Sequence, residues 1–199
     1  DIEHIRRSVL DRSALEKAAH QTDLVIHTAG LWDGTPGGVE RMWQLNVEGT
    51  RSVLSLDLPL VYTSSSITCG FGNREQPGTE DQPSEDPRCP LEGTPRVYRE
   101  TKLAAEELVK NAGAWIVNPD YVIGAGDVNG VVTRPLLRAS RLPLVPAPKG
   151  GKCFVDVEDV ARGHLLALRY GRPGRRYLLG AENRSYADIL SALTRLSGR

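Results

Sequence analysis

A tyrosine and a lysine four positions apart, Tyr98 and Lys102, are the residues of this chain with the clearest capacity for chemistry. They open a helical pattern, and side chains at this spacing share one helix face, so the ammonium can lower the pKa of the phenol. The hydroxyl cluster Thr63 to Ser66 precedes them, and one of its serines can hydrogen-bond the same substrate oxygen. These groups suit proton transfer to or from an alcohol or a ketone beside a hydride carrier.

Two other segments carry polar or small residues at positions where ligands bind. Asn46 falls on the apolar stripe of an expected helix, where an unpaired amide would cost ~1–3 kcal/mol, so it should be tied to backbone, water or a catalytic group. His27-Thr28-Ala29-Gly30 follows a short apolar run, as at the carboxyl end of a strand. Ligands of open α/β sheets bind just beyond such strand ends.

Expected strands and helices alternate along the chain, which predicts an α/β fold with a doubly wound, mostly parallel sheet and helices on both faces. Ser13 and Glu16 fit a capping box at the first helix. We treat residues 1–199 as one domain, with residues of about 120–155 and 180–199 contributing to a small C-terminal substrate lobe. Strands are expected at 24–26, 58–62, 115–117, 154–157 and 177–179, and helices from 11 or 13 onward and at 39–54, 98–110, 160–170 and 186–196.

The composition is that of an ordinary globular chain with balanced charge. Of 199 residues, 40% are apolar, and 25 basic residues balance 25 acidic ones without segregating into blocks. We therefore expect no nucleic-acid partner and no anionic membrane surface as a partner. No apolar run approaches the ~20 residues of a membrane span, so a small-molecule substrate in the cytoplasm is the expected setting.

Isolated cysteines, histidines and tryptophans receive no catalytic role. Three distant cysteines, Cys69, Cys89 and Cys153, are interpreted as reduced thiols. His27 is expected to fix a strand end rather than to bind a metal. Trp32 and Trp43 are expected to be core or pocket-wall aromatics.

In its motifs and their order, the chain resembles the extended short-chain dehydrogenase/reductases. Within that family it is most similar to the branch of 3β-hydroxysteroid dehydrogenases, dihydroflavonol 4-reductases and NAD-dependent epimerases and dehydratases. This resemblance implies a Rossmann-type sheet. The matching segments are His27 to Gly30, Asn46 to Thr50, Val61 to Ser65, Tyr98 to Lys102, Asn118 to Gly124, and Phe154 to Ala161.

The resemblance implies a catalytic role for four residues. Tyr98 would be the general acid/base, and Lys102 would favour its phenolate and bind the nicotinamide ribose. Ser65 would orient the substrate oxygen, with Ser66 taking this role if the strand register shifts by one residue. Asn46 would hold the link that relays protons behind Lys102.

The implied cofactor is NAD or NADP. Thr28, Ala29 and Gly30 would lie close to its ribose and phosphates, where a small backbone footprint is needed. Besides Tyr98 and Lys102, the remaining predicted cofactor contacts are Pro119 and Val122 at the nicotinamide and Val9 at the adenine. No metal site is predicted, because Asp156, Glu158 and Asp159 resemble the structural cap of the helix that follows.

The chain departs from the family pattern at its start and in two connections. It begins after the expected glycine-rich turn, so the first βαβ unit is expected to be missing, and residues 5–11 look like the third strand. The connections at 54–59 and 111–113 are shorter than the family pattern requires. We interpret the chain as a truncated form or as one from which pieces have been removed.

Three functions remain open on this evidence. The leading one is an NAD(P)-dependent oxidoreductase that interconverts a secondary alcohol and a ketone on an apolar substrate of steroid or flavonoid type. The alternatives are an NAD-dependent sugar-nucleotide epimerase or dehydratase, and a non-catalytic binding or scaffold protein. A homodimer is the expected option for a protein partner.

Overall fold

A computed structural model describes residues 2–73, 75–82, 91–128, 130–140, 147 and 149–196 of the protein. The chain divides into two compact units. The first comprises residues 1–118 and 164–178, and the second comprises residues 119–163 and 179–199. The candidate site lies in the first unit, which is therefore described first.

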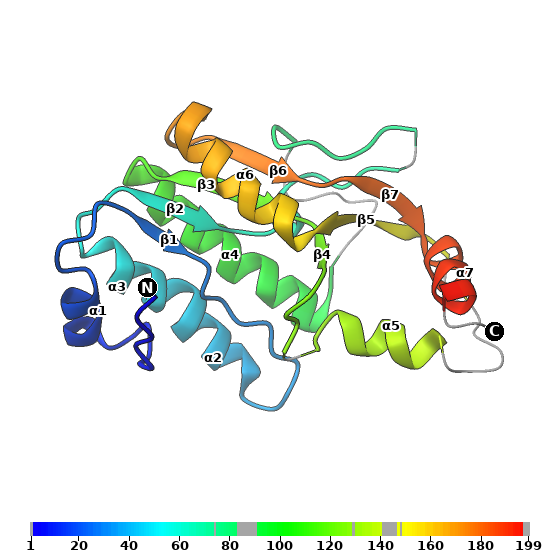
Figure 1. Cartoon of the computed structure of the whole chain (residues 1–199), viewed down its shortest axis with the longest axis horizontal. Coiled ribbons are helices and arrows are strands. Elements are labelled where there is room, and N and C mark those ends of the chain that lie inside the picture. Colours follow the sequence, from blue (N-terminus) through cyan, green and yellow to red (C-terminus); the bar gives the residue numbers. More distant parts are fainter. Residues whose placement is uncertain are drawn as a thin grey trace. The chain divides into compact units, whose positions relative to one another are not determined.

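A four-stranded sheet is the centre of the first unit. Its order is β1 (Val25–His27), β2 (Leu60–Thr63), β3 (Trp115–Pro119) and β6 (Arg176–Leu179) (Figure 1). The first three strands are parallel, with Val61 opposite both Ile26 and Trp115. Parallel strands bring their carboxyl ends to one sheet edge, where the segments after β1 and β2 meet.

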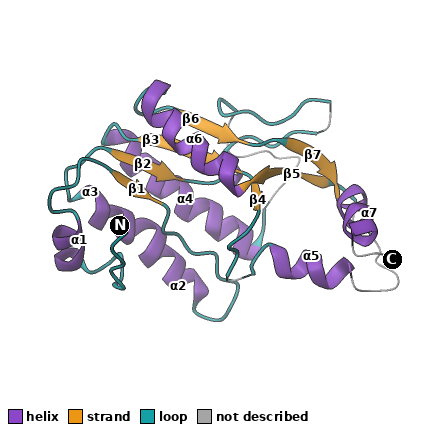
Figure 2. Cartoon of the chain, in the orientation of Figure 1, coloured by secondary structure: helices purple, strands orange, loops and turns teal. Residues whose placement is uncertain are grey.

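Helices cover both faces of this sheet. α4 (Gly93–Asn111) packs with α2 (Gly38–Trp43) and α3 (Gly49–Leu54) on the face that carries Leu60 and Tyr62 (Figure 2). Alternate strand residues point to the opposite face. There Thr63 Oγ1 lies 2.7 Å from Nε2 of His164, in the second half of α6 (Val157–Tyr170). The predicted doubly wound, mostly parallel sheet is confirmed.

The core lies between the sheet and α3 and α4. Its aromatic member, Tyr62, is fully buried. The buried residues of this cluster are Val53, Leu60, Tyr62, Ala105, Val109, Ala114 and Ile116.

A π-helical turn interrupts the helix predicted at 39–54. α2 passes into the π-turn η1 (Gln44–Glu48), which passes into α3 without a break. Such turns often mark functional positions, and this one contains the buried Asn46.

The prediction that the two tryptophans lie in the core is wrong. Trp32, in the loop after β1, is 51% exposed, and Trp43, at the end of α2, is 40% exposed.

In the structure, both connections that were predicted to be too short join their elements within a few residues. Between α3 and β2, Asp57 adopts a left-handed conformation with φ 53°, and its amide donates to Leu54 O. Between α4 and β3, Gly113 has φ 70°, which a glycine adopts without steric cost. A left-handed residue reverses the chain within three or four positions, so no longer loop is required.

The N-terminal segment differs from its prediction. Residues 5–11 form no strand, and the first regular element is α1 (Arg12–Ala18). Its N-cap is Asp11, whose Oδ1 accepts from the amide of Ala14 at 3.1 Å, rather than Ser13. Glu16 pairs with Arg12 at 2.9 Å instead of closing a capping box. Asp11 takes the cap because its carboxylate is the stronger acceptor near a helix N-terminus.

The second unit contains a small sheet in the order β4 (Tyr121–Ile123), β5 (Gly151–Asp156) and β7 (Glu182–Ser185). β5 pairs parallel to β4 and antiparallel to β7. This unit also contains α5 (Thr133–Ser140), and α7 (Tyr186–Leu196) as predicted. β4, β7 and α5 were not predicted. β4 has only three residues, β7 is polar throughout, and α5 has only eight residues.

Asp156 caps α6, which begins in the second unit. Its Oδ1 accepts from the amide of Glu158 at 2.7 Å. The predicted structural cap is therefore confirmed for Asp156, whereas no capping contact of Glu158 or Asp159 is found among the described residues.

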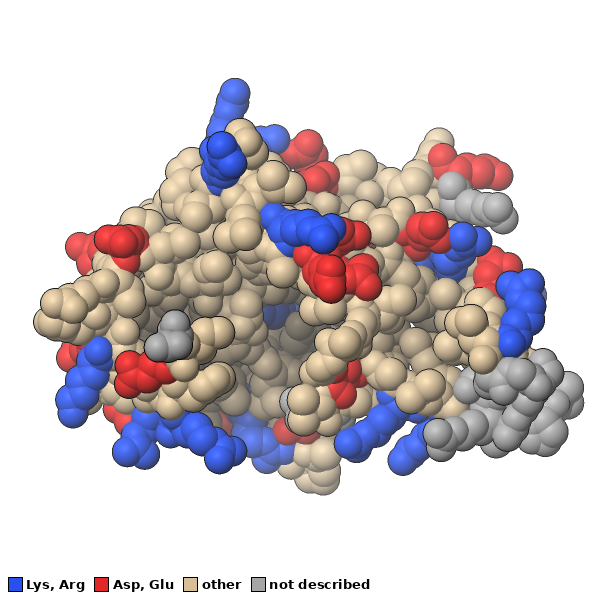
Figure 3. Space-filling model, in the orientation of Figure 1, with Lys and Arg blue, Asp and Glu red and all other residues tan. Residues whose placement is uncertain are grey.

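Surface charges of both signs are mixed on the face drawn in Figure 3. Arg162, for example, lies 3.1 Å from Asp159 and 3.5 Å from Glu158. Among the described residues, no helix combines the length and apolar character that crossing a membrane requires. Cys69 and Cys153 are free thiols, and Cys89 lies outside the described residues.

Candidate active site

The candidate site lies at the carboxyl ends of β1 and β2, beside α4. Thr28 to Gly30 follow β1, the serine cluster follows β2, and Tyr98 and Lys102 occupy successive turns of α4. The parallel sheet brings these three segments together, as the positions of ligand sites in α/β folds require.

Ser65 is the serine of the cluster that meets Tyr98. It is the N-cap of the short 3₁₀ turn η2 (Ser66–Thr68), and its Oγ accepts from the amide of Ile67 at 3.4 Å. A hydrogen bond with Ser65 lowers the pKa of Tyr98. Ser64 Oγ is instead buried, without a partner among the described residues. The choice of Ser65 rather than Ser66 for the substrate oxygen stays a prediction.

The net effect on Tyr98 is the reverse of the predicted one. Burial raises the pKa of Tyr98, and the hydrogen bond with Ser65 opposes this shift only in part. Lys102 Nζ donates to the carbonyl oxygen of Thr63 at 2.9 Å and to Tyr62 Oη at 3.3 Å. Its hydrogen bonds are thus directed to β2, and the predicted depression of the Tyr98 pKa is not observed.

Lys102 is a buried cation that no carboxylate of the described residues contacts directly. It is 3% exposed, and burial lowers its pKa to about 8, although the charge of Glu106 raises it. Its Nζ lies 4.9 Å above the centre of the Tyr62 ring, which adds a cation–π contact. Sequence reasoning missed Tyr62, whose only signal was its position in β2, two residues after Leu60 on the same face.

Asn46 connects the loop after β1 to α4. Its Oδ1 accepts from the amide of Leu31 at 2.7 Å, and its Nδ2 donates to Leu31 O and to Thr101 Oγ1, both at 2.9 Å. Thr101 Oγ1 in turn donates to the carbonyl oxygen of Tyr98 at 2.8 Å. The buried amide is fully paired, and it fixes the turn of helix that carries Tyr98. Its predicted role in a proton relay stays a prediction.

His27 supports the same region from the end of β1. Its Nε2 lies 3.1 Å from Thr50 Oγ1, and Thr50 donates its single hydroxyl hydrogen to the carbonyl oxygen of Asn46 at 2.7 Å. We therefore assign the Nε2–H tautomer, with Thr50 as acceptor. Burial, together with the charge of Lys102, lowers the pKa of His27 to about 4.

The strand end Thr28 to Gly30 has the properties of a cofactor cradle. All three residues are exposed and small. A Cβ atom at Gly30 would lie 3.2 Å from Lys102 Nζ and 3.5 Å from Asn46 Oδ1, so a side chain would crowd this approach. The arrangement fits a ribose or phosphate group that the lysine ammonium and the open backbone hold together.

The other predicted cofactor contacts belong to other segments of the chain. Val9 packs on the core, and a Cβ atom at Gly49 of α3 would lie 2.8 Å from its Cγ1. Pro119 and Val122 belong to the second unit, where Val122 pairs with Val155. Their roles at the cofactor stay predictions.

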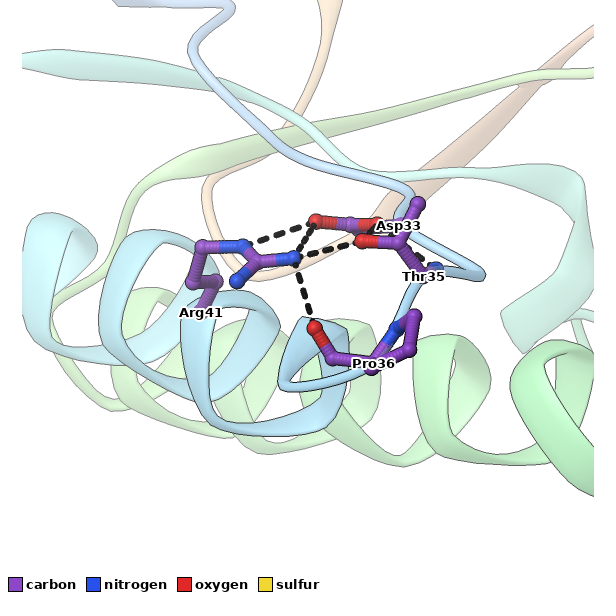
Figure 4. Close-up of polar contacts among 4 residues, drawn as sticks. All are labelled: Asp33, Thr35, Pro36 and Arg41. Atoms are coloured by element: carbon purple, nitrogen blue, oxygen red, sulfur yellow. Dashed lines mark hydrogen bonds and ion pairs between the residues drawn. The ribbon is translucent and has the colours of Figure 1, made fainter.

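A clasp of polar contacts holds the loop between Gly30 and α2 (Figure 4). Arg41 Nε and Nη2 lie 2.8 and 2.6 Å from Asp33 Oδ2, and Asp33 Oδ1 accepts from the amide and hydroxyl of Thr35. Nη2 also donates to Pro36 O. The hydrogen bonds from Thr35, and then those from Arg41, lower the pKa of Asp33 to about 2. Sequence reasoning did not identify this clasp.

Comparisons with known proteins identify relatives of this chain. A protein of Synechocystis sp. that carries the provisional name dihydroflavonol 4-reductase is 33% identical over 189 residues, covering 87% of this chain and 54% of that protein. Sterol demethylase protein B of Methylococcus capsulatus is 27% identical, covering 99% of this chain and 62% of that protein. The chain thus spans little more than half the length of these relatives.

The fold is similar to that of a solved sugar-nucleotide enzyme. The dTDP-glucose 4,6-dehydratase DesIV of Streptomyces venezuelae, crystallised with NAD, superposes with a TM-score of 0.75 at 19% identity, covering 98% of this chain and 63% of that one. The model of the NAD dependent epimerase/dehydratase family matches residues 2–180. The chain therefore belongs to the NAD dependent epimerase/dehydratase family, within the extended short-chain dehydrogenase/reductases that its motifs predicted.

Proposed function

We propose that the protein is an NAD(P)-dependent oxidoreductase that interconverts a secondary alcohol and a ketone. The observation that carries this proposal is the hydrogen bond between Ser65 and Tyr98, with the ammonium of Lys102 buried one turn further along α4. Two hydroxyl groups beside a fixed cation can bind one substrate oxygen and exchange a proton with it.

In the reduction direction, the Tyr98 hydroxyl donates its proton to the substrate oxygen while the Ser65 hydroxyl hydrogen-bonds that oxygen. In the oxidation direction, the Tyr98 phenolate accepts the proton. A bound nicotinamide would supply or accept the hydride. Lys102 and the strand end Thr28 to Gly30 would hold the ribose and phosphates, while Val9, Pro119 and Val122 are the remaining proposed contacts.

For proton transfer at neutral pH, a nearby charge must offset the rise that burial causes in the pKa of Tyr98. Burial disfavours the phenolate, so a nearby positive charge is needed to bring proton transfer within reach at neutral pH. Lys102, with a pKa of about 8, is predominantly charged at pH 7, and a nearby anion would favour the charged form further. In this proposal Lys102 positions the cofactor and stabilises the developing phenolate.

The substrate is proposed to be apolar, of steroid or flavonoid type. The names of the two relatives refer to a flavonol and to a sterol, and the balanced charge of the chain supports a neutral substrate. A second candidate is a sugar-nucleotide epimerase or dehydratase, because the family includes both enzyme classes. A homodimer is also proposed, to be tested by sedimentation of the purified protein.

The test is Tyr98→Phe in the full-length protein, with Tyr170→Phe, a 69% exposed tyrosine, as the matched control. Tyr98→Phe should retain cofactor binding, measured by fluorescence titration, and lose about 10²–10⁴-fold in turnover. Tyr170→Phe should keep turnover. Retained turnover in Tyr98→Phe would refute the assignment.

The net reduction of the cofactor during turnover distinguishes the two enzyme classes. A dehydrogenase accumulates reduced cofactor as it oxidises an alcohol, whereas an epimerase regenerates its cofactor within each cycle. Absorbance at the reduced-nicotinamide band, followed together with substrate consumption, distinguishes them. A protein that binds no cofactor in its full-length form would instead support the scaffold function.

A further inference from the structure

Glu106 is a buried carboxylate that the proposed mechanism does not use. It lies on α4, one turn after Lys102, and is 3% exposed. Its Oε1 accepts from Thr68 Oγ1 at 2.5 Å and from Asn118 Nδ2 at 2.8 Å, and its Oε2 lies 2.8 Å from Arg176 Nε. A buried carboxylate needs such partners, because burying a charge without them is costly.

The same hydrogen-bond network ends on the backbone of Ser65. The carbonyl oxygen of Ser65 accepts from Thr68 Oγ1 at 2.8 Å and from Asn118 Nδ2 at 3.2 Å. Thr68 has one hydroxyl hydrogen and Asn118 has two amide hydrogens, so Glu106 and the Ser65 carbonyl share these donors. Any change at Glu106 therefore redistributes the hydrogen bonds that hold Ser65.

Glu106 also determines which way the Asn118 amide points. Asn118 is fully buried, and its Oδ1 has no partner among the described residues. The reverse orientation would place this oxygen against the Glu106 carboxylate, where two acceptors repel each other. The negative charge of Glu106 thus keeps Nδ2 directed at the carbonyl of Ser65.

Arg176, on β6, closes the network from the other side. Besides its ion pair with Glu106, its Nη1 donates to the carbonyl oxygen of Thr68 at 3.3 Å. The guanidinium therefore holds both the carboxylate and the short turn that begins at Ser65. Its side chain is 28% exposed, which keeps part of its charge hydrated.

We propose that Glu106 is a positioning residue for Ser65, acting through Thr68 and Asn118, and that its negative charge is required for this role. The inference rests on the proposed function insofar as Ser65 binds the substrate oxygen. Its structural part, that the charge of Glu106 holds the turn from Ser65 to Cys69, can be tested without turnover.

The first measurement is amide hydrogen exchange in Glu106→Gln, which keeps the side-chain shape and removes the charge. The amides of Thr68 and Cys69 donate to Ser65 O and Ser66 O at 3.1 and 2.9 Å, so their exchange reports opening of the turn. We expect both to exchange about tenfold faster or more, relative to the amides of Val61 and Tyr62 in β2. Unchanged relative exchange would overturn the proposal.

Matched variants separate this effect from a general loss of stability. Glu107→Gln removes an exposed charge at the next position of α4 and should leave exchange in the turn unchanged. Thr68→Val removes only the hydroxyl link and should accelerate exchange as Glu106→Gln does. If Glu106→Gln fails to fold, the Thr68→Val result decides, and unchanged exchange in that variant overturns the proposal.

The second measurement is steady-state kinetics of the full-length protein. Glu106→Gln should lower kcat about 10- to 100-fold at saturating cofactor, because a displaced Ser65 no longer orients the substrate oxygen. Saturation removes any effect on cofactor binding, which the variant can change because the charge of Glu106 raises the pKa of Lys102. Faster exchange with unchanged kcat would overturn the positioning role. If Tyr98→Phe also retains turnover, the proposed function has failed, and the exchange data still decide whether Glu106 holds the turn.

Discussion

Acidification from pH 7 to 4 should destabilise the first unit through the protonation of one residue, His27. This side chain is 3% exposed, and its assigned Nε2–H donates to Thr50, which in turn donates to the carbonyl oxygen of Asn46 in the π-turn. Protonation adds a second buried positive charge near Lys102, whose charge already lowers the pKa of His27. Acid should therefore weaken the unit at the site itself.

The size of the effect follows from the pKa of His27, which falls from 6.5 to about 4 on folding. Between these values the unfolded chain binds a proton that the folded chain does not, so stability is lost as the pH falls. The shift corresponds to about 3 kcal/mol, fully present above pH 6.5 and lost by about pH 4. Asp33, whose pKa is lowered to about 2, loses its contribution only at lower pH, outside this window.

Urea unfolding from pH 4 to pH 7, compared between the wild-type protein and His27→Gln, measures this contribution. The glutamine amide can still donate to Thr50 but does not titrate, so the pH dependence between 4 and 6.5 should flatten by about 3 kcal/mol. Imidazole NMR should show His27 still neutral at pH 5. An equal pH dependence in both proteins, or titration of His27 near pH 6.5, would refute the reasoning.

Two further predictions concern the segment after β1. Gly30→Ala should change the free energy of unfolding by less than about 1 kcal/mol, because the added methyl group meets the flexible end of Lys102. The same variant should bind the cofactor about tenfold more weakly, which calorimetry of the full-length protein would measure. Asp33→Asn should loosen the clasp with Arg41 and accelerate limited proteolysis within residues 31–37. The control is Glu16→Gln, which removes a charge from the exposed ion pair with Arg12 and should leave that cleavage unchanged.

The elements that carry the site were largely predictable, because hydrophobic periodicity reports them directly. The helix that bears Tyr98 and Lys102 and the strand that begins at Trp115 both form where the sequence predicted them, although the helix starts earlier, at Gly93, and the strand continues to Pro119. Capping chemistry was predictable at Asp156 but not at Asp11, where two candidate caps stood two residues apart. Local patterns determine that an element exists more firmly than they determine its ends.

The partners of the site residues were not predictable, because they depend on contacts between distant segments. Lys102 is bound by Tyr62 and the Thr63 carbonyl, 40 and 39 positions away. No local spacing reports such pairs. The raised pKa of Tyr98 was not predictable for the same reason, since helical spacing placed the lysine nearby but did not show that its hydrogen bonds go to β2.

The buried polar residues show why these distant contacts matter for function. An isolated charge inside a protein is destabilising, yet Lys102 lies in the interior with a carbonyl and a phenol as its partners. Asn46 satisfies every polar atom of its side chain from within a π-turn, a form of helix that is rare without a functional reason. A fold selected for stability alone would place apolar side chains at both positions. Their retention beside an open, small-residue strand end is explained if the ammonium must meet an anionic or hydroxyl-rich ligand there, which is the cofactor role that we propose.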